Sequence, residues 1–371
     1  MNTERFETLA VHGGEPRPPE GGSVVHPIHQ GTVYETGPGG DAPYIRLGTN
    51  PTQRHLHRRL AALEDAEDAV ATASGMAAIS VALHSVLGAG DHLIAAGSFY
   101  GGTLRFLTEH AERLGWTYDL VDPADDHAWR KALRPETKAF LTETITNPLV
   151  QVGDLPGAAR FAREHAIASL IDNTLATPVV FRPHSVGFDL VCHSATKALN
   201  GHSDLAAGVV TGSRERIARV ASVMSAYGCA LDPHAAFLLS RGLKTLALRV
   251  RQQHANAMAV ATFLEGHDRI ADVRYPGLAA HPDHRRATAL FDGYGSVLAF
   301  RPVGGAAAAD ELVASLRLPY AASSLGGVES LVTRVSARGE AAGLPDDLIR
   351  FSAGIEATDD LVADFASALR D

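Results

Sequence analysis

The chain has 371 residues, of which 46% are hydrophobic and 20% charged, and its formal net charge is −9. This composition is typical of a globular protein, and the length suggests two domains. The negative charge argues against nucleic acid or an anionic membrane as a main partner, and no apolar run is long enough to cross a bilayer. Two cysteines, Cys192 and Cys229, provide no disulfide framework and suggest a reducing cytoplasm.

The first 43 residues are rich in glycine, proline and histidine, in stretches such as GGEPRPPEGG and ETGPGGDAP. Such stretches do not hold regular structure, so we expect residues 1–43 to form an extended arm that contacts a neighbouring subunit. No pair of the 18 histidines has a metal-ligand spacing with supporting Cys or Glu, so we expect no metal site.

Apolar runs and helical patterns alternate in the next part of the chain. The expected strands are 92–96, 118–121, 139–142, 169–172 and 190–193, and the expected helices are 75–87, 101–114, 126–133 and 155–166. This alternation predicts an α/β domain over residues 44–225 with a mostly parallel sheet. A long helical region at 234–264, strands at 270–274, 295–301 and 348–353, and a last helix at 358–370 predict a smaller α+β domain over residues 226–371.

Chemically distinct side chains follow consecutive strands. Tyr100 is followed by two glycines, Asn147 closes a strand in TETITNP, Asp172 ends the next, and Lys197 follows a later strand. Each one alone is explained as well or better by turn or cap chemistry. Together they lie where a parallel sheet binds its ligands, at the carboxyl ends of the strands.

One ligand would use this whole set. The lysine could form a Schiff base, the carboxylate could pair with a pyridinium nitrogen, and the tyrosine could stack on the ring. A phosphate could bind the start of the helix at Gly75 and Met76 and the hydroxyls of Ser194 and Thr196. These residues therefore predict a pyridoxal 5′-phosphate site.

The chain also resembles a known family, the cystathionine γ-synthase-like, or Cys/Met metabolism, pyridoxal-phosphate enzymes of trans-sulfuration and related amino-acid metabolism. The matching motifs are SGMAAI (74–79), FYGGT (99–103), ETITNPL (143–149), DNTLATP (172–178), HSATKALNGHSD (193–204), RGLKTLALR (241–249), SLGGVESL (324–331) and IRFSAGIE (349–356). The resemblance implies the type I, aspartate-aminotransferase-like fold of PLP-dependent transferases. It also implies a homotetramer built from tight dimers, with each active site completed by the neighbour.

The resemblance assigns a role to each matching residue. Lys197 would form the aldimine and, through a quinonoid, shuttle protons; Asp172 would hold the ring nitrogen and Tyr100 would stack on the ring. Other expected cofactor contacts are Gly75, Met76, Thr174, Ser194 and Thr196, with Tyr44 and Arg46 reaching the phosphate of the adjacent subunit. The expected substrate contacts are Arg350, which would bind the carboxylate, with Ser324, Asn147 and Glu143 beside it. Without the resemblance, surface salt bridges would explain Arg46 and Arg350 better.

The chain departs from the family pattern at several places. Thr49 adds a residue to the usual Y-x-R-x-x-N-P-T motif, and Pro43 and Ser323 stand where relatives that act on cystathionine commonly carry Glu. Gly102 stands where methionine γ-lyases typically have Cys, and residues 333–343 lack the usual P…THS pattern. The absence of both glutamates, at Pro43 and Ser323, argues against cystathionine as the substrate.

We therefore expect an enzyme that eliminates or replaces a group at Cγ of an amino acid of the homoserine, methionine or cysteine group. Two alternatives remain open at this point: a β-eliminating C–S lyase, and γ-replacement with a nonstandard nucleophile in a specialised pathway. An aminotransferase and a non-catalytic scaffold that kept the fold are more distant alternatives.

Overall fold

Seven strands form the larger sheet of the computed structural model, which describes residues 5–37, 39, 42–335 and 344–370. Their order across the sheet is β1 (Asp68–Thr72), β7 (Gly208–Gly212), β6 (Leu190–Ser194), β5 (Ala168–Asp172), β4 (Thr137–Glu143), β2 (His92–Ala96) and β3 (Thr117–Val121). Only β7 runs antiparallel to its neighbours; the other pairs are parallel. The predicted mostly parallel α/β sheet is therefore confirmed.

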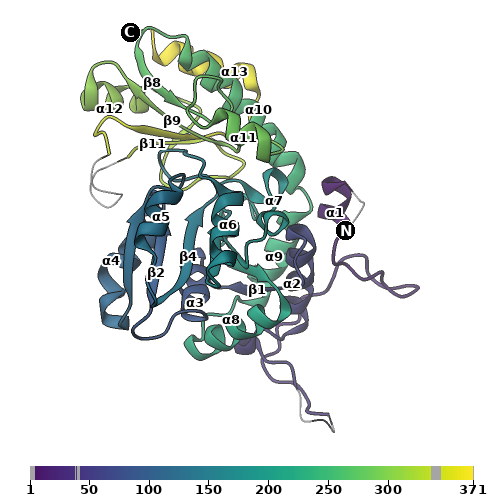
Figure 1. Ribbon diagram of the computed structural model, residues 1–371. Coiled ribbons are helices and arrows are strands. Elements are labelled where there is room, and N and C mark those ends of the chain that lie inside the picture. The colour runs from purple at the N-terminus through teal and green to yellow at the C-terminus, as the bar shows by residue number, and fades with distance from the viewer. Residues whose placement is uncertain (1–4, 38, 40–41, 336–343, 371) are drawn as a thin grey trace.

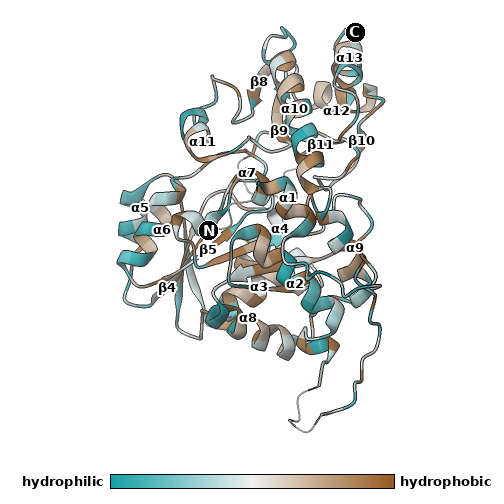
Figure 2. Cartoon of the chain, turned by 90° about the vertical axis from the view of Figure 1, so that its right-hand side faces the viewer, coloured by the Kyte–Doolittle hydropathy of each residue, from teal (hydrophilic) through white to brown (hydrophobic). Residues whose placement is uncertain are grey.

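Helices cover both faces of this sheet, which is why its strands are nearly continuous apolar runs. One face packs against α3 (Gly75–His84), α4 (Gly101–His110) and α8 (Arg214–Tyr227). The other face packs against α2 (Pro51–Glu64), α5 (Asp126–Ala132), α6 (Leu155–Glu164) and α9 (Pro233–Leu243). The apolar strands lie between these helices in Figure 2.

A second, five-stranded sheet forms the smaller domain at the top of Figure 1. Its order is β10 (Tyr320–Ala321), β11 (Leu331–Arg334), β12 (Ile349–Ser352), β9 (Val297–Pro302) and β8 (Ile270–Arg274). It shares a separate hydrophobic core with α10 (Leu246–Glu265), α12 (Gly305–Ser315) and α13 (Thr358–Ala368). Short helices complete the fold: α1 (Phe6–His12), α7 (Thr177–Val180) and α11 (His284–Leu290), with 3-10 turns at Ile45–Leu47, Glu112–Leu114 and Pro183–Val186. In the described part of the chain, no helix combines the length and apolarity that crossing a membrane requires.

Some element boundaries differ from the sequence prediction. The expected helical region 234–264 is two helices, α9 and α10, separated at Lys244 and Thr245. The strands β1 and β7 were not predicted, because short runs of Ala, Gly, Val and Thr carry little pattern. The expected boundary after residue 225 lies inside α8, and the larger core includes Leu246 and Val250 at the start of α10, whereas the core of the smaller domain includes α10 residues from Ala257 onward. We propose that the domains divide within α10.

The N-terminal segment begins with helix α1, whose Leu9 and Ala10 are buried in the larger core. The glycine- and proline-rich residues that follow are without helix or strand over 13–37, and they extend away from the body in Figure 1. Glu15 attaches this segment to the body through ion pairs with Arg59 and with Lys244, the latter at 2.9 Å. The arm was expected to be extended throughout, and the structure corrects this for α1, whose apolar residues can be buried.

Candidate active site

A cavity of about 350 Å³ lies at the carboxyl ends of the central parallel strands, on the side of the smaller domain. The expected residues that line it are Gly75, Met76, Tyr100, Glu143, Asn147, Asp172, Thr174, Ser194, Thr196, Lys197, Ser324 and Arg350. They come from both domains and from positions up to 275 residues apart in the chain. The fold therefore brings together nearly all of the residues that the sequence singled out.

The start of α3 forms one wall of the cavity. The side chain of Ser74 caps this helix by accepting a hydrogen bond from the amide of Ala77 at 3.1 Å. The amides of Gly75 and Met76 precede the first intrahelical bond, as in any helix N-terminus, and are available to an anion. A Cβ atom at Gly75 would lie 2.6 Å from Cβ of Ser194, so this close approach to β6 requires glycine.

Asp172 lies at the end of β5, where its carboxylate is fixed by Thr174. The hydroxyl and the amide of Thr174 both donate to Oδ1 of Asp172, at 2.5 and 2.9 Å. The same hydroxyl accepts the amide of Ser194 at 2.8 Å, which links β5 to the loop that carries Lys197. Burial raises the pKa of Asp172, so a cationic partner in the cavity would be needed to stabilise its ionised form.

Glu143 is the neighbour of Asp172 across the sheet, at the end of β4. Its two carboxylate oxygens accept the main-chain amides of Tyr100 at 2.8 Å and Asn147 at 3.1 Å. Burial, and then the nearby charge of Asp172, raise the pKa of Glu143 well above its ordinary value. Glu143 thus connects two loops of the site, in addition to lining the cavity where a substrate contact is expected.

Lys197 projects into the cavity from the loop after β6. Its Nζ donates a hydrogen bond to Oγ of Ser324, 2.6 Å away, on a loop of the smaller domain. Burial, and then the positive charge of Arg350, lower the pKa of Lys197 to about 8. Ser324 has a φ of 99°, a conformation rare for residues with a side chain and often found at functional sites.

Arg350 lies on β12 and is buried, with 5% of its surface exposed. Its Nη1 donates to Oδ1 of Asn147 at 3.0 Å, and its Nη2 donates to the carbonyl of Ser324 at 3.2 Å. These bonds orient a planar guanidinium at the edge of the same cavity as Lys197. A guanidinium in this orientation is suited to bind a carboxylate with two parallel hydrogen bonds.

Tyr44 and Arg46 do not line the cavity. Arg46 Nη1 binds Ser225, donating to its carbonyl at 3.1 Å and to its hydroxyl at 3.0 Å. Tyr44 is 41% exposed, and the guanidinium of Arg46 lies 5.5 Å from the centre of its ring. These two residues are thus separate from the site of their own chain, and their expected role in a neighbouring subunit stays a prediction.

Gly102 leaves room for Tyr100, which lies at the start of α4. A Cβ atom at position 102 would lie 2.4 Å from Cε1 of Tyr100, so any side chain there would displace the ring. Ser323 lines the cavity, whereas Pro43 does not. Of the segment 333–343, residues 336–343 lie outside the described residues.

Several lining residues were absent from the predicted set: Ser74, Ile79, Thr103, Ile145, Leu175 and Leu325. Ser74 and Thr103 belong to the motifs SGMAAI and FYGGT, so motif membership could have identified them. The four apolar residues, Ile79, Ile145, Leu175 and Leu325, also lie within matching motifs, but their chemical type adds no signal, because an inward-facing isoleucine or leucine resembles any other core residue in the sequence.

The donor set fits pyridoxal 5′-phosphate. Helix-start amides and two hydroxyls suit a phosphate, and the glycine at position 75 permits the close approach. A carboxylate, an exposed aromatic ring and a lysine of lowered pKa surround the same cavity. Among the described residues, no group of three or more His, Cys, Asp or Glu side chains could hold a metal ion.

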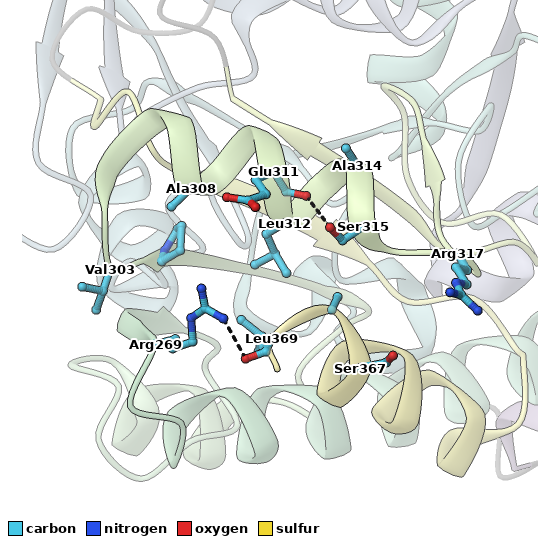
Figure 3. A pocket seen from close by; sticks show the side chains of 12 residues that line it. Arg269, Val303, Ala308, Glu311, Leu312, Ala314, Ser315, Arg317, Ser367 and Leu369 are labelled. Carbon is cyan, nitrogen blue, oxygen red and sulfur yellow. Dashed lines mark hydrogen bonds between the residues drawn. The ribbon is translucent and has the colours of Figure 1, made fainter. Parts of the chain in front are cut away.

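A second cavity, of about 400 Å³, lies in the smaller domain between α12 and α13. Figure 3 shows Arg269 donating to the carbonyl of Leu369, at 3.2 Å, with Glu311 on the opposite wall. This cavity shares no lining residue with the first one, and its charged side chains are exposed to solvent. It is therefore separate from the candidate active site.

Comparisons with known proteins show what the whole chain is similar to. Residues 7–370 match the family described as Cys/Met metabolism PLP-dependent enzyme. The chain is 39% identical to the cystathionine gamma-synthase of Mycobacterium tuberculosis, over 98% of this chain and 96% of that protein. It is 38% identical to the cystathionine beta-lyase of Lactococcus lactis and to the cystathionine gamma-lyase of Bacillus subtilis, in each case over 98% of both chains.

Solved structures show the same likeness. The crystal structure of metB from Corynebacterium glutamicum superposes with a TM-score of 0.95 and 34% identity, over 99% of this chain and 98% of that chain. The cystathionine gamma-lyase from Lactobacillus plantarum complexed with L-serine gives a TM-score of 0.93 and 34% identity, over 98% of both chains. The predicted type I fold is confirmed, and the relatives divide among three activities at nearly equal identity.

Proposed function

The chain belongs to the Cys/Met metabolism PLP-dependent enzymes, and from this premise we propose that it eliminates or replaces a group at Cγ of an amino acid. The substrate class is the homoserine, methionine and cysteine group. Pyridoxal 5′-phosphate, when bound, supplies the electron sink that stabilises negative charge on the substrate. The residues of the cavity hold the reactants and move the protons.

The observation that carries this proposal is the position of Ser324 between the lysine and the arginine. Its hydroxyl accepts Nζ of Lys197 at 2.6 Å, and its carbonyl accepts Nη2 of Arg350 at 3.2 Å. A substrate carboxylate on Arg350 would therefore place its α-carbon, and its β-carbon one bond further, beside the same amine. An amine whose pKa is about 8 can accept and return protons at both carbons near neutral pH.

The remaining residues would orient the cofactor. Asp172 would hold the proton on the ring nitrogen, since Thr174 fixes its Oδ1 by two hydrogen bonds. The first amides of α3, Ser194 and Thr196 would bind the phosphate. Tyr100 would cover one face of the ring, in the space that Gly102 leaves.

The cavity supports a leaving group without positive charge. Among the described residues that line it, only Glu143 and Asp172 are acidic. Both oxygens of Glu143 accept main-chain amides, and Asp172 is expected to serve the ring nitrogen. A distal ammonium such as that of cystathionine would find no further carboxylate among the described lining residues, so an O-activated homoserine fits better, with a thiol or a nonstandard nucleophile as acceptor.

Elimination at Cβ is the second candidate. It needs only the first proton transfer by Lys197, and the cystathionine beta-lyase of Lactococcus lactis is as similar to this chain as the gamma-lyase of Bacillus subtilis. The cavity of about 350 Å³ would also hold a shorter substrate.

The test is a substrate panel with products identified by mass spectrometry. Purified holoenzyme is mixed with O-acyl-homoserines, cystathionine, methionine and an amino acid with a β-leaving group, each with and without a thiol. We expect O-acyl-homoserine to give a new thioether or 2-oxobutanoate, and the Lys197→Ala variant to give neither. Pyruvate from the β-leaving substrate, with no product from any γ-substituted one, would exclude the Cγ proposal.

We also propose that the enzyme acts as a homo-oligomer in which Tyr44 and Arg46 reach the cavity of a neighbour. Their exposure, and their separation from the cavity of their own chain, support this arrangement. A dimer of dimers remains the expected assembly.

A further inference from the structure

Helix α10 carries a row of buried polar side chains on the face toward the active site. Arg249, Gln253 and Asn256 are spaced four and three residues apart, which places them on one face of the helix. Their exposed fractions are only 4%, 0% and 0%. Burying polar groups is unfavourable unless hydrogen bonds compensate, so their partners indicate why they are there.

Arg249 binds the loop that follows the active-site lysine. Its Nη1 donates to the carbonyl of Ala198 at 2.7 Å, and its Nη2 donates to the carbonyls of Gly242 at 2.8 Å and Leu199 at 3.4 Å. Ala198 is the residue directly after Lys197. The guanidinium therefore fixes the main chain from which the lysine projects.

Gln253 binds the loop that begins at Ser324. Its Nε2 donates to the carbonyl of Gly327 at 2.6 Å and to that of Gly326 at 3.4 Å. A Cβ atom at Gly326 would lie 2.6 Å from the amide nitrogen of Ala198, and Gly326 has a φ of 76°. This glycine thus lets the Ser324 loop pack directly on the Lys197 loop.

Asn256 binds the chain that continues from Arg350. Its Nδ2 donates to the carbonyls of Gly354 at 3.0 Å and Glu356 at 2.8 Å. Its Oδ1 accepts a hydrogen bond from the hydroxyl of Thr358 at 2.6 Å. The end of β12, and with it Arg350, is therefore held by the same helix.

The three loops also bind one another. The amide of Val328 donates to the carbonyl of Gly201 at 3.0 Å, and the amide of Ile355 donates to the carbonyl of Val328 at 2.9 Å. The Ser324 loop thus lies between the Lys197 loop and the chain after Arg350. A shift of any one loop would disturb the other two.

We propose that Arg249, Gln253 and Asn256, the α10 polar stripe, are positioning residues that hold Lys197, Ser324 and Arg350 in one working arrangement. None of the three lines the cavity, and they would act through the main chain of the three loops that they bind. Lys197 and Arg350 come from different domains, and α10 contributes to both hydrophobic cores, so it is placed to fix the two groups relative to each other. This inference rests on the proposed function only in taking these three residues as the working groups.

The test replaces Gln253 by methionine, which has a similar volume but cannot donate to the two carbonyls. The control is Val260→Ala, which removes buried methyl groups of the same helix from the core of the smaller domain and no hydrogen bond to the loops. We expect kcat/KM of the Gln253→Met holoenzyme to fall by about 10- to 100-fold, because a small misplacement of reacting groups is costly. The control should lose thermal stability to a similar degree and keep kcat/KM within about twofold.

A second readout does not depend on which reaction is catalysed. In the cofactor-free full chain, the pH dependence of amine modification at Lys197 is followed by peptide mass spectrometry. For the wild type and the control we expect a midpoint near the pKa of about 8 for Lys197, and for Gln253→Met a midpoint shifted toward the ordinary 10.5. This shift in the labelling midpoint would support the positioning role of the α10 polar stripe even if the substrate panel contradicted the Cγ proposal.

The inference is overturned if kcat/KM and the labelling midpoint of Gln253→Met both match those of Val260→Ala. Should Gln253→Met fail to fold, Arg249→Lys takes its place, since lysine keeps the charge but cannot bind all the carbonyls that the guanidinium reaches. The kcat/KM and the labelling midpoint of Arg249→Lys are then compared with those of Val260→Ala, and a match in both would overturn the inference.

Discussion

At the scale of single residues, the candidate site depends on an amine whose environment disfavours its charge. Lys197 is partly buried, and a neighbouring positive charge is Arg350, so both influences lower its pKa. The carboxyl groups behave in the opposite way, since burial raises the pKa of both Glu143 and Asp172. The cavity thus contains groups with shifted pKa values of both signs, a common property of active sites.

Replacing Lys197 by methionine should stabilise the cofactor-free protein at neutral pH. The pKa of Lys197 is about 8 in the folded protein and 10.5 ordinarily, so the unfolded chain binds more protons between these values and stability rises with pH across this window. We expect Lys197→Met to be more stable than wild type by about 1–2 kcal/mol at pH 7, after the lost bond to Ser324 is subtracted. The measurement is the free energy of unfolding in urea at several pH values.

The advantage of this variant should shrink as the pH rises from 8 toward 10.5, where wild-type Lys197 becomes neutral in both states. A difference in unfolding free energy that stayed constant from pH 7 to pH 10 would show that burial of the charged amine is not its cause. Wild type measured across the same pH range serves as the reference.

At the scale of elements, the start of α3 and the end of β6 form one unit. The helix begins with glycine because the strand end at Ser194 leaves no space for a side chain there. The same arrangement places the unbonded amides of the first turn toward the cavity. The close contact between Gly75 and Ser194 therefore sets both the position of α3 and the position of the amides that would bind an anion.

The Gly75→Ala substitution tests this contact. A methyl group 2.6 Å from Cβ of Ser194 must push the helix and strand apart, which should cost about 1–3 kcal/mol of unfolding free energy. The dissociation constant for pyridoxal 5′-phosphate should rise by about 10-fold or more, since 1.4 kcal/mol corresponds to a factor of ten. Titration of the cofactor-free protein, followed by visible absorbance, measures it.

Gly266→Ala is the matched control, because its added Cβ would meet no atom closer than 4.0 Å and the site is the end of α10. We expect this variant to bind the cofactor as wild type does. Equal cofactor affinities for Gly75→Ala and Gly266→Ala would refute the role given to the α3 start.

At the scale of the whole molecule, the cavity is formed jointly by two domains, and the N-terminal arm extends from the body. Val24 and Val33 of the arm are 80% and 83% exposed, unusually high values for valine. A neighbouring subunit would cover such side chains, as expected for an arm that contacts another chain. The proposed contribution of Tyr44 and Arg46 to a neighbour's cavity agrees with this arrangement.

Mixed oligomers test that contribution. Arg46→Ala and Lys197→Ala subunits should each be inactive alone, because one lacks the group given to the neighbour and the other lacks the amine. Co-expressed with two affinity tags, they should form mixed dimers in which one of the two cavities has both groups intact, so the purified mixed dimer should have about half of wild-type activity. Activity is assayed on the purified mixed species and on each parent.

No recovery in the mixed species, with both parents properly assembled, would place Arg46 in the function of its own chain. Full activity of the Arg46→Ala variant alone would show that Arg46 contributes to no cavity, neither its own nor a neighbour's. Sedimentation of wild type and variants confirms that assembly is unchanged.

The sequence by itself determined the fold class and most of the cavity. Apolar runs that end in Asp172 or precede Lys197 locate strands and polar groups together, because the carboxyl ends of parallel strands share one edge of the sheet. Strands β2 and β8 match their predicted ranges, while β1 and β7 were missed, since short segments of small residues pair only when a finished sheet offers them a neighbour.

Only the tertiary structure decided how these groups are held. That Ser324 lies between Lys197 and Arg350, that Glu143 accepts two main-chain amides, and that α10 holds three loops are all contacts between residues far apart in the chain. Local sequence encodes which groups are present. Their distances, and therefore their pKa values and the space left for a substrate, depend on how two domains pack against each other.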